Sequence, residues 1–411
     1  MPQPLCQNLF LSPTDPIEVM NVINSLNASK ASGPNSIPSH LFKLCSPILC
    51  KPISFIINES FNQGIFPDIL KLAKVTPVYK SGPTEVCSNY GPLSLLSNIS
   101  NVIEKTVCTR LNDFLEKYEL LYDLQFGFRK NYSTNHALIN LVTNINDILE
   151  GGEYACGIFI DLQKAFDTVN HDILLNKLEI YGVRGIPLNW FESYLKGRKQ
   201  FVALESANSD IQVMDFGVPQ GSILGPLLFL IYINDFRRSV KSGLVQHFAD
   251  DTVILFRNTS MKKLNRILTR EISTFYDWLC ANRLSLNSTK SDVLLFRAKN
   301  KRCEVKFNLK VKNKRIPLSK KTTYLGIVLD SRLAWIDQIS ELSKKLARAN
   351  GLLAKIRYYV DTPTIKSLYY SLFHSHMTYG CLTWGLASKS NISRIIKLQQ
   401  HALRIITFSI L

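Results

Sequence analysis

The sequence predicts an α+β fold that combines helices with a mostly antiparallel sheet. Long segments carry apolar residues at helical spacing, so much of the chain is expected to be helical. One continuous apolar run at 154–162 predicts a strand that is buried on both faces. Two further apolar segments flank Asp250 and Asp251, and they predict two strands joined by a turn that holds both carboxylates.

The helical pattern recurs along the whole chain. It covers residues 16–26, 39–61, 99–119, 135–149, 262–280 and the chain from 336 onward. Residues 75–80 have the pattern of a strand that ends at the turn Ser81-Gly82-Pro83. The longest apolar run, 223–233, is too short to span a bilayer, which takes about 20 residues, and therefore predicts a core helix.

Positive charge is concentrated in one segment. The net charge is +17, and residues 257–357 hold 24 Lys and Arg against 7 Asp and Glu, so this segment carries the whole excess. A localised basic field is typical of proteins that bind a polyanion, most often nucleic acid. The alternative is a basic surface without a specific partner.

The cysteines predict an intracellular protein, nuclear or cytoplasmic, that is not secreted. All nine are scattered, and none forms a Cys-x-x-Cys motif or a Cys/His cluster at zinc spacing. This pattern favours reduced thiols over a disulfide framework. The first residues also lack the basic and then apolar pattern of a signal peptide.

Three carboxylates are predicted to meet on adjacent strands of one sheet. Asp161 lies at the end of the buried strand, at the sheet edge where such folds build their sites. Together with Asp250 and Asp251 it provides the minimum set for holding two Mg²⁺ ions, which prefer oxygen ligands. The alternatives are a solvated hairpin turn for the Asp pair and a helix N-cap for Asp161.

Two further segments have features of a nucleotide site. Phe166 lies five residues after Asp161, so its ring is expected beside the sugar of a bound nucleotide; the alternative is a core aromatic. Gln220 and Gly221 precede the core helix, where glycine permits close approach of a ligand and Ser222 can cap the helix. A simple junction between loop and helix is the alternative there.

These elements, in this order, resemble the reverse transcriptases of non-LTR (LINE-type, jockey-like) retrotransposons. The resemblance is colinear from about residue 16 to the C-terminus. Besides Phe159–Val169, it rests on short motifs at 30–38, 89–96, 125–129, 217–222, 248–251, 282–290 and 324–327. So many matching elements in one order make a chance resemblance negligible.

The resemblance implies roles for the site residues. Asp161, Asp250 and Asp251 would bind two Mg²⁺ ions, and Phe166 would be the steric gate that excludes ribonucleotides. Lys290 would assist the departure of pyrophosphate, although it also fits an ordinary surface lysine. The remaining implied contacts are Gln220 and Gly221 with the incoming nucleotide and template, Lys80 and Arg129 with triphosphate or template, and Tyr324, Leu325 and Gly326 in the primer grip.

The resemblance also implies a right-hand polymerase with palm, fingers and thumb. Residues 1–70 would form an N-terminal helical extension, 71–330 the fingers and palm, and 331–411 a helical thumb and the start of a C-terminal region. The partners would be an RNA template, a DNA primer or target, and deoxynucleoside triphosphates. Family members usually carry an N-terminal endonuclease, so we expect this chain to be the polymerase segment of a longer reading frame.

One departure from the family pattern leaves a second hypothesis open. The family usually has Arg where this chain has Gly91, and that Arg is expected to hold the triphosphate. Losing a charge-assisted hydrogen bond costs roughly 1.5–3 kcal/mol. The chain is therefore expected to be either an active RNA-directed DNA polymerase or a decayed, catalytically weak remnant that only binds nucleic acid. The spacing of the motifs disfavours a splicing-type maturase of the same fold.

Overall fold

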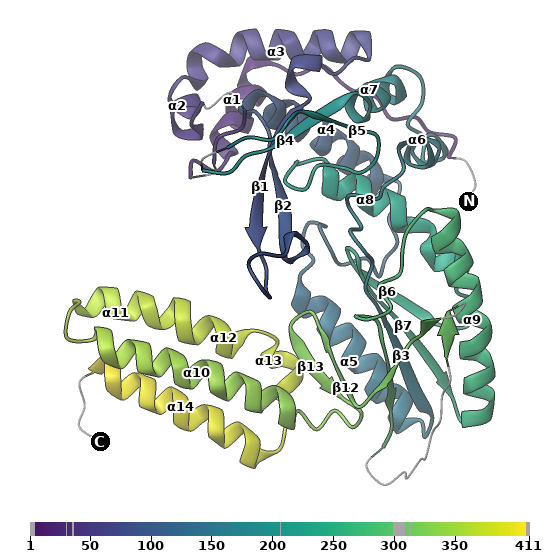
Figure 1. Ribbon diagram of the computed structural model, residues 1–411, viewed down its shortest axis with the longest axis vertical. Helices are drawn as coiled ribbons and strands as arrows, with labels where there is room; N and C mark the ends of the chain where they lie inside the picture. The colour runs from purple at the N-terminus through teal and green to yellow at the C-terminus, as the bar shows by residue number, and fades with distance from the viewer. Residues whose placement is uncertain are drawn as a thin grey trace. The chain divides into compact units, whose positions relative to one another are not determined.

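The computed structural model describes residues 5–29, 31–34, 37–205, 207–298, 309–311 and 314–407. These form two compact units, each assembled from separate stretches of the chain (Figure 1). The first comprises Met1–Asp123, Gln163–Ser239 and Asp277–Ser285, and the second Leu124–Leu162, Val240–Tyr276 and Leu286–Leu411. Lys30, Asn35 and Ser36 of the motif at 30–38 lie outside the described residues.

The first unit combines helices with a four-stranded sheet. Its helices are α1 (Pro16–Ser25), α2 (Ser39–Leu44), α3 (Ser46–Gln63), α4 (Asn98–Lys117), α6 (His171–Ile180), α7 (Ile186–Leu195) and α8 (Gly225–Ile233). Its strands are β1 (Leu72–Tyr79), β2 (Tyr90–Leu95), β4 (Arg198–Val202) and β5 (Gln212–Met214), in the order β2-β1-β4-β5. β1 pairs antiparallel with β2 and parallel with β4.

The second unit is built around a five-stranded sheet in the order β11-β8-β3-β7-β6. The strands of the whole second unit are β3 (Tyr154–Ile160), β6 (Leu244–Phe248), β7 (Asp251–Asn258), β8 (Asp292–Phe296), β9 (Lys310–Val311), β10 (Lys314–Arg315), β11 (Leu318–Ser319), β12 (Lys321–Tyr324) and β13 (Ile327–Asp330). Its helices are α5 (Thr134–Glu150), α10 (Ile336–Ile356), α11 (Thr362–Leu368), α12 (Ser375–Thr378), α13 (Cys381–Trp384) and α14 (Lys389–Thr407). α9 (Met261–Ala281) begins in this unit and ends in the first.

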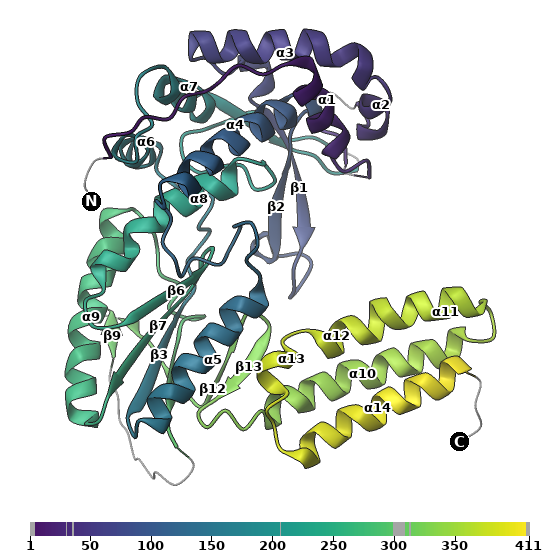
Figure 2. The same cartoon turned by 180° about the vertical axis from the view of Figure 1, so that it is seen from behind.

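β3 is the central strand of this sheet and pairs antiparallel with both β7 and β8. Six of its seven residues are buried, which confirms the predicted two-sided burial. The sheet lies between α5 and α9 in both views (Figures 1 and 2). Ala155 and Phe159 of β3 pack into one apolar core with α5 and with the C-terminal helices α10, α11, α13 and α14.

The apolar patterns predict most elements to within a few residues, with one correction. The expected single helix over 39–61 is two helices, α2 and α3, which meet at Cys45. Pro47 in the first turn of α3 explains the break, because proline has no N–H to continue the hydrogen bonding of α2, whereas it is tolerated in the first turn of a new helix. β9 and β10 pair antiparallel as a short hairpin, and residues 312–313 between them lie outside the described part of the chain.

Candidate active site

The three predicted carboxylates lie at one edge of the five-stranded sheet. Ile160, the last residue of β3, pairs with Thr252 of β7. Asp161 follows Ile160 and Asp251 precedes Thr252, so both extend this pair by one residue at the same end of the sheet. Asp250 occupies the turn between β6 and β7. The structure therefore brings together the residues that the sequence predicted to meet.

The carboxylates influence one another electrostatically. The pKa of Asp251 is raised to about 6. The larger cause is partial desolvation, and the smaller one is the negative charge of Asp250 and Asp161. Asp251 is an exposed residue, so solvent screens part of this repulsion. A bound cation would relieve the repulsion among the three groups, and carboxylate oxygens are the ligands that Mg²⁺ prefers. Within the described ranges, however, no cluster of three or more His, Cys, Asp or Glu is already arranged as a metal site.

The turn that carries Asp250 is held in place by the segment 125–127, which belongs to one of the motifs named above. The side-chain oxygen of buried Gln125 accepts hydrogen bonds from the N–H groups of Gly127 and Ala249, at 2.9 and 3.0 Å. Ala249 has a φ of 56°, a left-handed conformation that is costly for a residue with a Cβ. A Cβ on Gly127 would lie 2.3 Å from the nitrogen of Ala249, so the two backbones are in close contact. Gln125 and Gly127 thus hold the strained residue next to Asp250.

The loop with Gln220 and Gly221 is attached to β2 in the first unit. The carbonyl oxygen of Gln220 accepts from the N–H of Ser94 at 2.7 Å, and its side-chain nitrogen donates to Asp167 Oδ1 at 2.9 Å. Gly221 has a φ of 125°, and a Cβ there would lie 2.4 Å from the carbonyl oxygen of Ser94. Only glycine fits this conformation and this close approach. Ser222 Oγ accepts from the N–H of Gly225, the first residue of α8, but the N-cap position itself is Leu224 and not the predicted Ser222.

A buried glutamate holds the start of α8, and sequence reasoning missed it. Glu104 of α4 accepts from the N–H groups of Ile223 and Leu224, at 2.8 and 3.4 Å, and from the hydroxyl of Tyr194 at 3.1 Å. A carboxylate at a helix N-terminus is favourable, because the free N–H groups there carry partial positive charge. Burial raises the pKa of Glu104, while the charge of Arg198 opposes that rise. The available signal was an acidic residue among apolar neighbours in the helical pattern of 99–119.

Lys80 and Gly91 lie next to each other in the hairpin of β1 and β2. Gly91 pairs with Val78, two residues before Lys80. A Cβ on Gly91 would lie 2.4 Å from Cε and 3.0 Å from Nζ of Lys80. The lysine side chain therefore covers the space that any side chain at position 91 would need. The absence of a side chain at Gly91 allows Lys80 to lie across it.

The chain matches the family model for reverse transcriptase (RNA-dependent DNA polymerase) over residues 78–329. It belongs to the reverse transcriptase family. It is 30% identical to a probable RNA-directed DNA polymerase from transposon BS of Drosophila melanogaster, over 98% of this chain and 46% of that protein. It is 28% identical to the RNA-directed DNA polymerase from mobile element jockey of the same organism, over 98% of this chain and 44% of that protein. The chain thus spans about half the length of these relatives, and the predicted resemblance to non-LTR elements is confirmed.

The remaining predicted site residues differ in their burial and in their contacts. Phe166 is half-buried and stacks on Phe229 of α8, with ring centroids 4.7 Å apart. Lys290 is exposed and lies in the turn that follows Asn287. Buried Tyr324 accepts from the Gln246 side chain at 3.1 Å.

Leu325, Gly326 and Arg129 are the last three of the predicted site residues. Leu325 has a φ of 46°, and its carbonyl oxygen accepts from the Tyr379 hydroxyl at 2.7 Å. Gly326 follows it with a φ of 75°. The Arg129 guanidinium lies 4.6 Å from the ring centroid of Tyr132.

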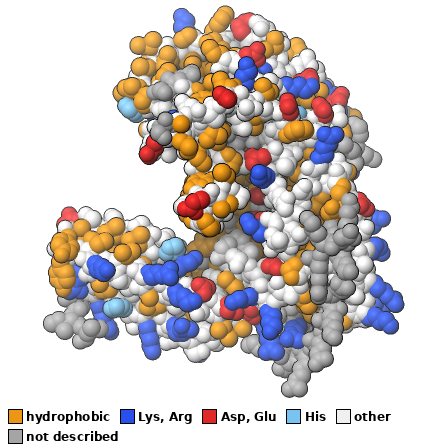
Figure 3. All heavy atoms as spheres, viewed as in Figure 1, with side chains coloured by type: hydrophobic (Ala, Val, Ile, Leu, Met, Phe, Trp, Pro, Cys, Tyr) orange, Lys and Arg blue, Asp and Glu red, His pale blue; other side chains and the backbone are white. Residues whose placement is uncertain are grey.

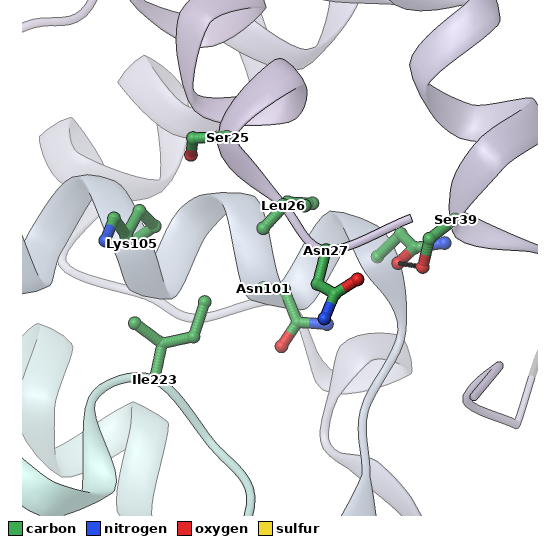
Figure 4. Close-up of a pocket in the computed structure, with 8 residues that line it drawn as sticks. Ser25, Leu26, Asn27, Ser39, Asn101, Lys105 and Ile223 are labelled. Atoms are coloured by element: carbon green, nitrogen blue, oxygen red, sulfur yellow. Dashed lines mark hydrogen bonds between the residues drawn. The ribbon is translucent and has the colours of Figure 1, made fainter. Parts of the chain in front are cut away.

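A separate hollow lies in the first unit, among α1, α2 and α4 (Figure 4). Its volume is about 210 Å³, and Asn27, Asn101 and Lys105 are among the residues that line it. None of the predicted site residues lines this hollow. None of the helices in the described parts of the chain is long and apolar enough to cross a membrane.

Proposed function

We propose that this chain is an RNA-directed DNA polymerase of a non-LTR retrotransposon, which extends a DNA primer on an RNA template. The observation that carries the proposal is the placement of Asp161, Asp250 and Asp251 at one sheet edge in a chain of the reverse transcriptase family. The raised pKa of Asp251 supports it, because such electrostatic cost is common at functional sites.

The three carboxylates would hold two Mg²⁺ ions. When bound, these ions lower the pKa of the primer 3′-hydroxyl and neutralise charge on the leaving pyrophosphate. The braced turn at Ala249 supplies a fixed backbone for two of the three ligands, and a preorganised site loses less free energy on binding. Lys290 is proposed to assist departure of the pyrophosphate.

The remaining site residues would bind the substrates. Gln220 and Gly221 would contact the incoming nucleotide and template from a loop that β2 holds in place. Phe166 would exclude ribonucleotides; its stacking on Phe229 supports a fixed ring position. Lys80 and Arg129 would bind triphosphate or template, and Tyr324, Leu325 and Gly326 would form the primer grip.

We further propose that the chain adopts the right-hand arrangement, with residues 1–70 as an N-terminal extension, 71–330 as fingers and palm, and 331–411 as thumb and start of a C-terminal region. Residues 336–407 carry 10 Lys and Arg against 3 Asp and Glu, which suits contact with a nucleic acid backbone. Lys and Arg side chains are visible in Figure 3 on the part of the molecule that α10, α11 and α14 form. The proposed partners are an RNA template, a DNA primer or target, and deoxynucleoside triphosphates.

The second candidate function is nucleic acid binding without efficient catalysis. Gly91 favours it, because the residue lacks the side chain expected to hold the triphosphate. Primer extension on an RNA template with Mg²⁺ separates the two candidates. Extension products support the polymerase, and salt-sensitive binding without extension supports the remnant.

A further inference from the structure

Asn287 contacts Asp161 through both its backbone and its side chain. The N–H of Asn287 donates to the carbonyl oxygen of Asp161 at 2.9 Å. Its side-chain nitrogen donates to Asp161 Oδ2 at 2.8 Å. The neighbouring residues Leu162 and Leu286 form a single antiparallel bridge, which keeps the two segments together. The carboxylate is therefore held by a residue that lies 126 positions later in the chain.

Two hydroxyl groups complete this arrangement. Thr289 Oγ1 donates to Asn287 Oδ1 at 2.7 Å, which fixes the amide with its nitrogen toward Asp161. An ionised carboxylate only accepts hydrogen bonds, so the amide must present its NH₂ group to Asp161. Ser291 Oγ accepts from the N–H of Asp161 at 3.1 Å. Backbone and side chain of Asp161 are thus both held by the segment 287–291.

We propose that Asn287 is a positioning residue for Asp161, and this inference rests on the proposed metal-binding function. The amide binds one carboxylate oxygen, Oδ2, and restricts the side-chain rotamer, which would leave the other oxygen, Oδ1, available to a metal ion. Partners that orient a metal ligand in this way typically contribute 10- to 100-fold to metal affinity.

If Asn287 had a purely structural role, its substitution would affect stability and not metal affinity. The backbone hydrogen bond to Asp161 and the Leu162–Leu286 bridge need no Asn side chain, so they remain in an Asn287→Ala variant. If the side chain only stabilised the turn, its loss would lower the free energy of unfolding and leave metal affinity unchanged. If it positions Asp161, metal affinity falls in protein that is still folded.

The test measures Mn²⁺ binding in the absence of nucleic acid. Electron paramagnetic resonance reports the concentration of the free ion. Mn²⁺ prefers the same oxygen ligands as Mg²⁺. Asn287→Ala is expected to weaken binding by about 10- to 100-fold. Thr289→Val, which leaves Asn287 in place but frees its amide, is expected to weaken binding by a smaller factor. Circular dichroism melting confirms that each variant is folded.

Asn144→Ala is the matched control, because its half-buried amide donates to the carbonyl oxygen of Asn140 within α5. It should leave Mn²⁺ affinity unchanged. Unchanged affinity in folded Asn287→Ala, with wild-type protein that binds Mn²⁺, would overturn the inference. Failure of wild-type protein to bind Mn²⁺, or unchanged binding in Asp161→Asn, would instead overturn the proposed metal role itself.

Discussion

The substitution Gly91→Ala tests whether Lys80 has taken the place of the missing side chain at position 91. Gly91 does not have a positive φ, so its backbone accepts alanine without strain. The new Cβ would lie 2.4 Å from Lys80 Cε, closer than real atoms approach. The obstructing atom is near the end of a flexible side chain, so Lys80 moves and the hairpin of β1 and β2 keeps its fold.

The expected effect follows from the strength of one charged contact. If Lys80 donates to the triphosphate, removing that contact costs roughly 1.5–3 kcal/mol, about 10- to 150-fold in nucleotide affinity. Lys80→Ala should show the full loss, and Gly91→Ala a partial one because the ammonium is only displaced. The two changes should therefore not be additive, since the second removes a contact that the first has already weakened.

The assay is primer extension with varied deoxynucleoside triphosphate, analysed as a double-mutant cycle. We expect the KM of Gly91→Ala to rise, and Lys80→Ala to cost less in the Gly91→Ala background than in wild type. Gly91→Arg, which displaces Lys80 but adds a guanidinium, should restore affinity to wild type or better. Equal costs of Lys80→Ala in both backgrounds would refute the idea that position 91 controls Lys80.

Three further results are expected. Glu104→Ala should lower the free energy of unfolding in urea by about 3–5 kcal/mol, because it breaks a buried charge network. Glu104→Gln keeps an acceptor oxygen, so it should lower the free energy of unfolding by less than half as much. Mg²⁺ should raise the melting temperature more at pH 7 than at pH 5, because Asp251 has a pKa of about 6 and below it protons compete with the metal; Asp251→Asn should reduce this pH dependence. Gly127→Ala should lower primer extension strongly, because its Cβ would lie 2.3 Å from the nitrogen of Ala249 and displace the turn that carries Asp250. Gly351→Ala is the control, because a Cβ at position 351 meets nothing within 4 Å.

The sign of the pH effect follows from the direction of the shift. The folded protein holds the proton of Asp251 more tightly than the unfolded chain, whose usual value is 3.8. Without metal, this contribution to stability is present below that value and is lost as the pH rises toward 6. Mg²⁺ binds the ionised form and offsets the loss. A melting temperature that responds equally to Mg²⁺ at both pH values would contradict the assignment of Asp251 as a ligand.

The elements of the site could be predicted from the sequence because their signals are local. The two-sided burial of β3 follows from its unbroken apolar run, and antiparallel pairing with β7 then places Asp161 beside Asp251. The ends of the elements are also predicted to within a few residues, apart from the break at Cys45, where Pro47 prevents α2 from continuing into α3.

The supporting contacts could not be predicted, because they join residues far apart in the chain. Gln125 accepts from Ala249 across 124 positions, Glu104 from Ile223 across 119, and Asn287 donates to Asp161 across 126. Each is a single polar side chain whose partner depends on how the elements pack. A polar residue within an apolar pattern signals that some partner exists, because buried polar groups are nearly always hydrogen-bonded. It does not say which one.

We propose that Asp161, Asp250 and Asp251 form the metal site of a polymerase. Primer extension on an RNA template with Mg²⁺ tests it most directly, with Asp161→Asn and Asp250→Asn compared with wild type and with Asp147→Asn of α5 as a matched surface control. We expect extension by wild type and the control, and a loss of at least about 1,000-fold in both site variants, consistent with the several kcal/mol that metal ions contribute to such reactions. Extension that survives in Asp161→Asn or Asp250→Asn would contradict this proposal.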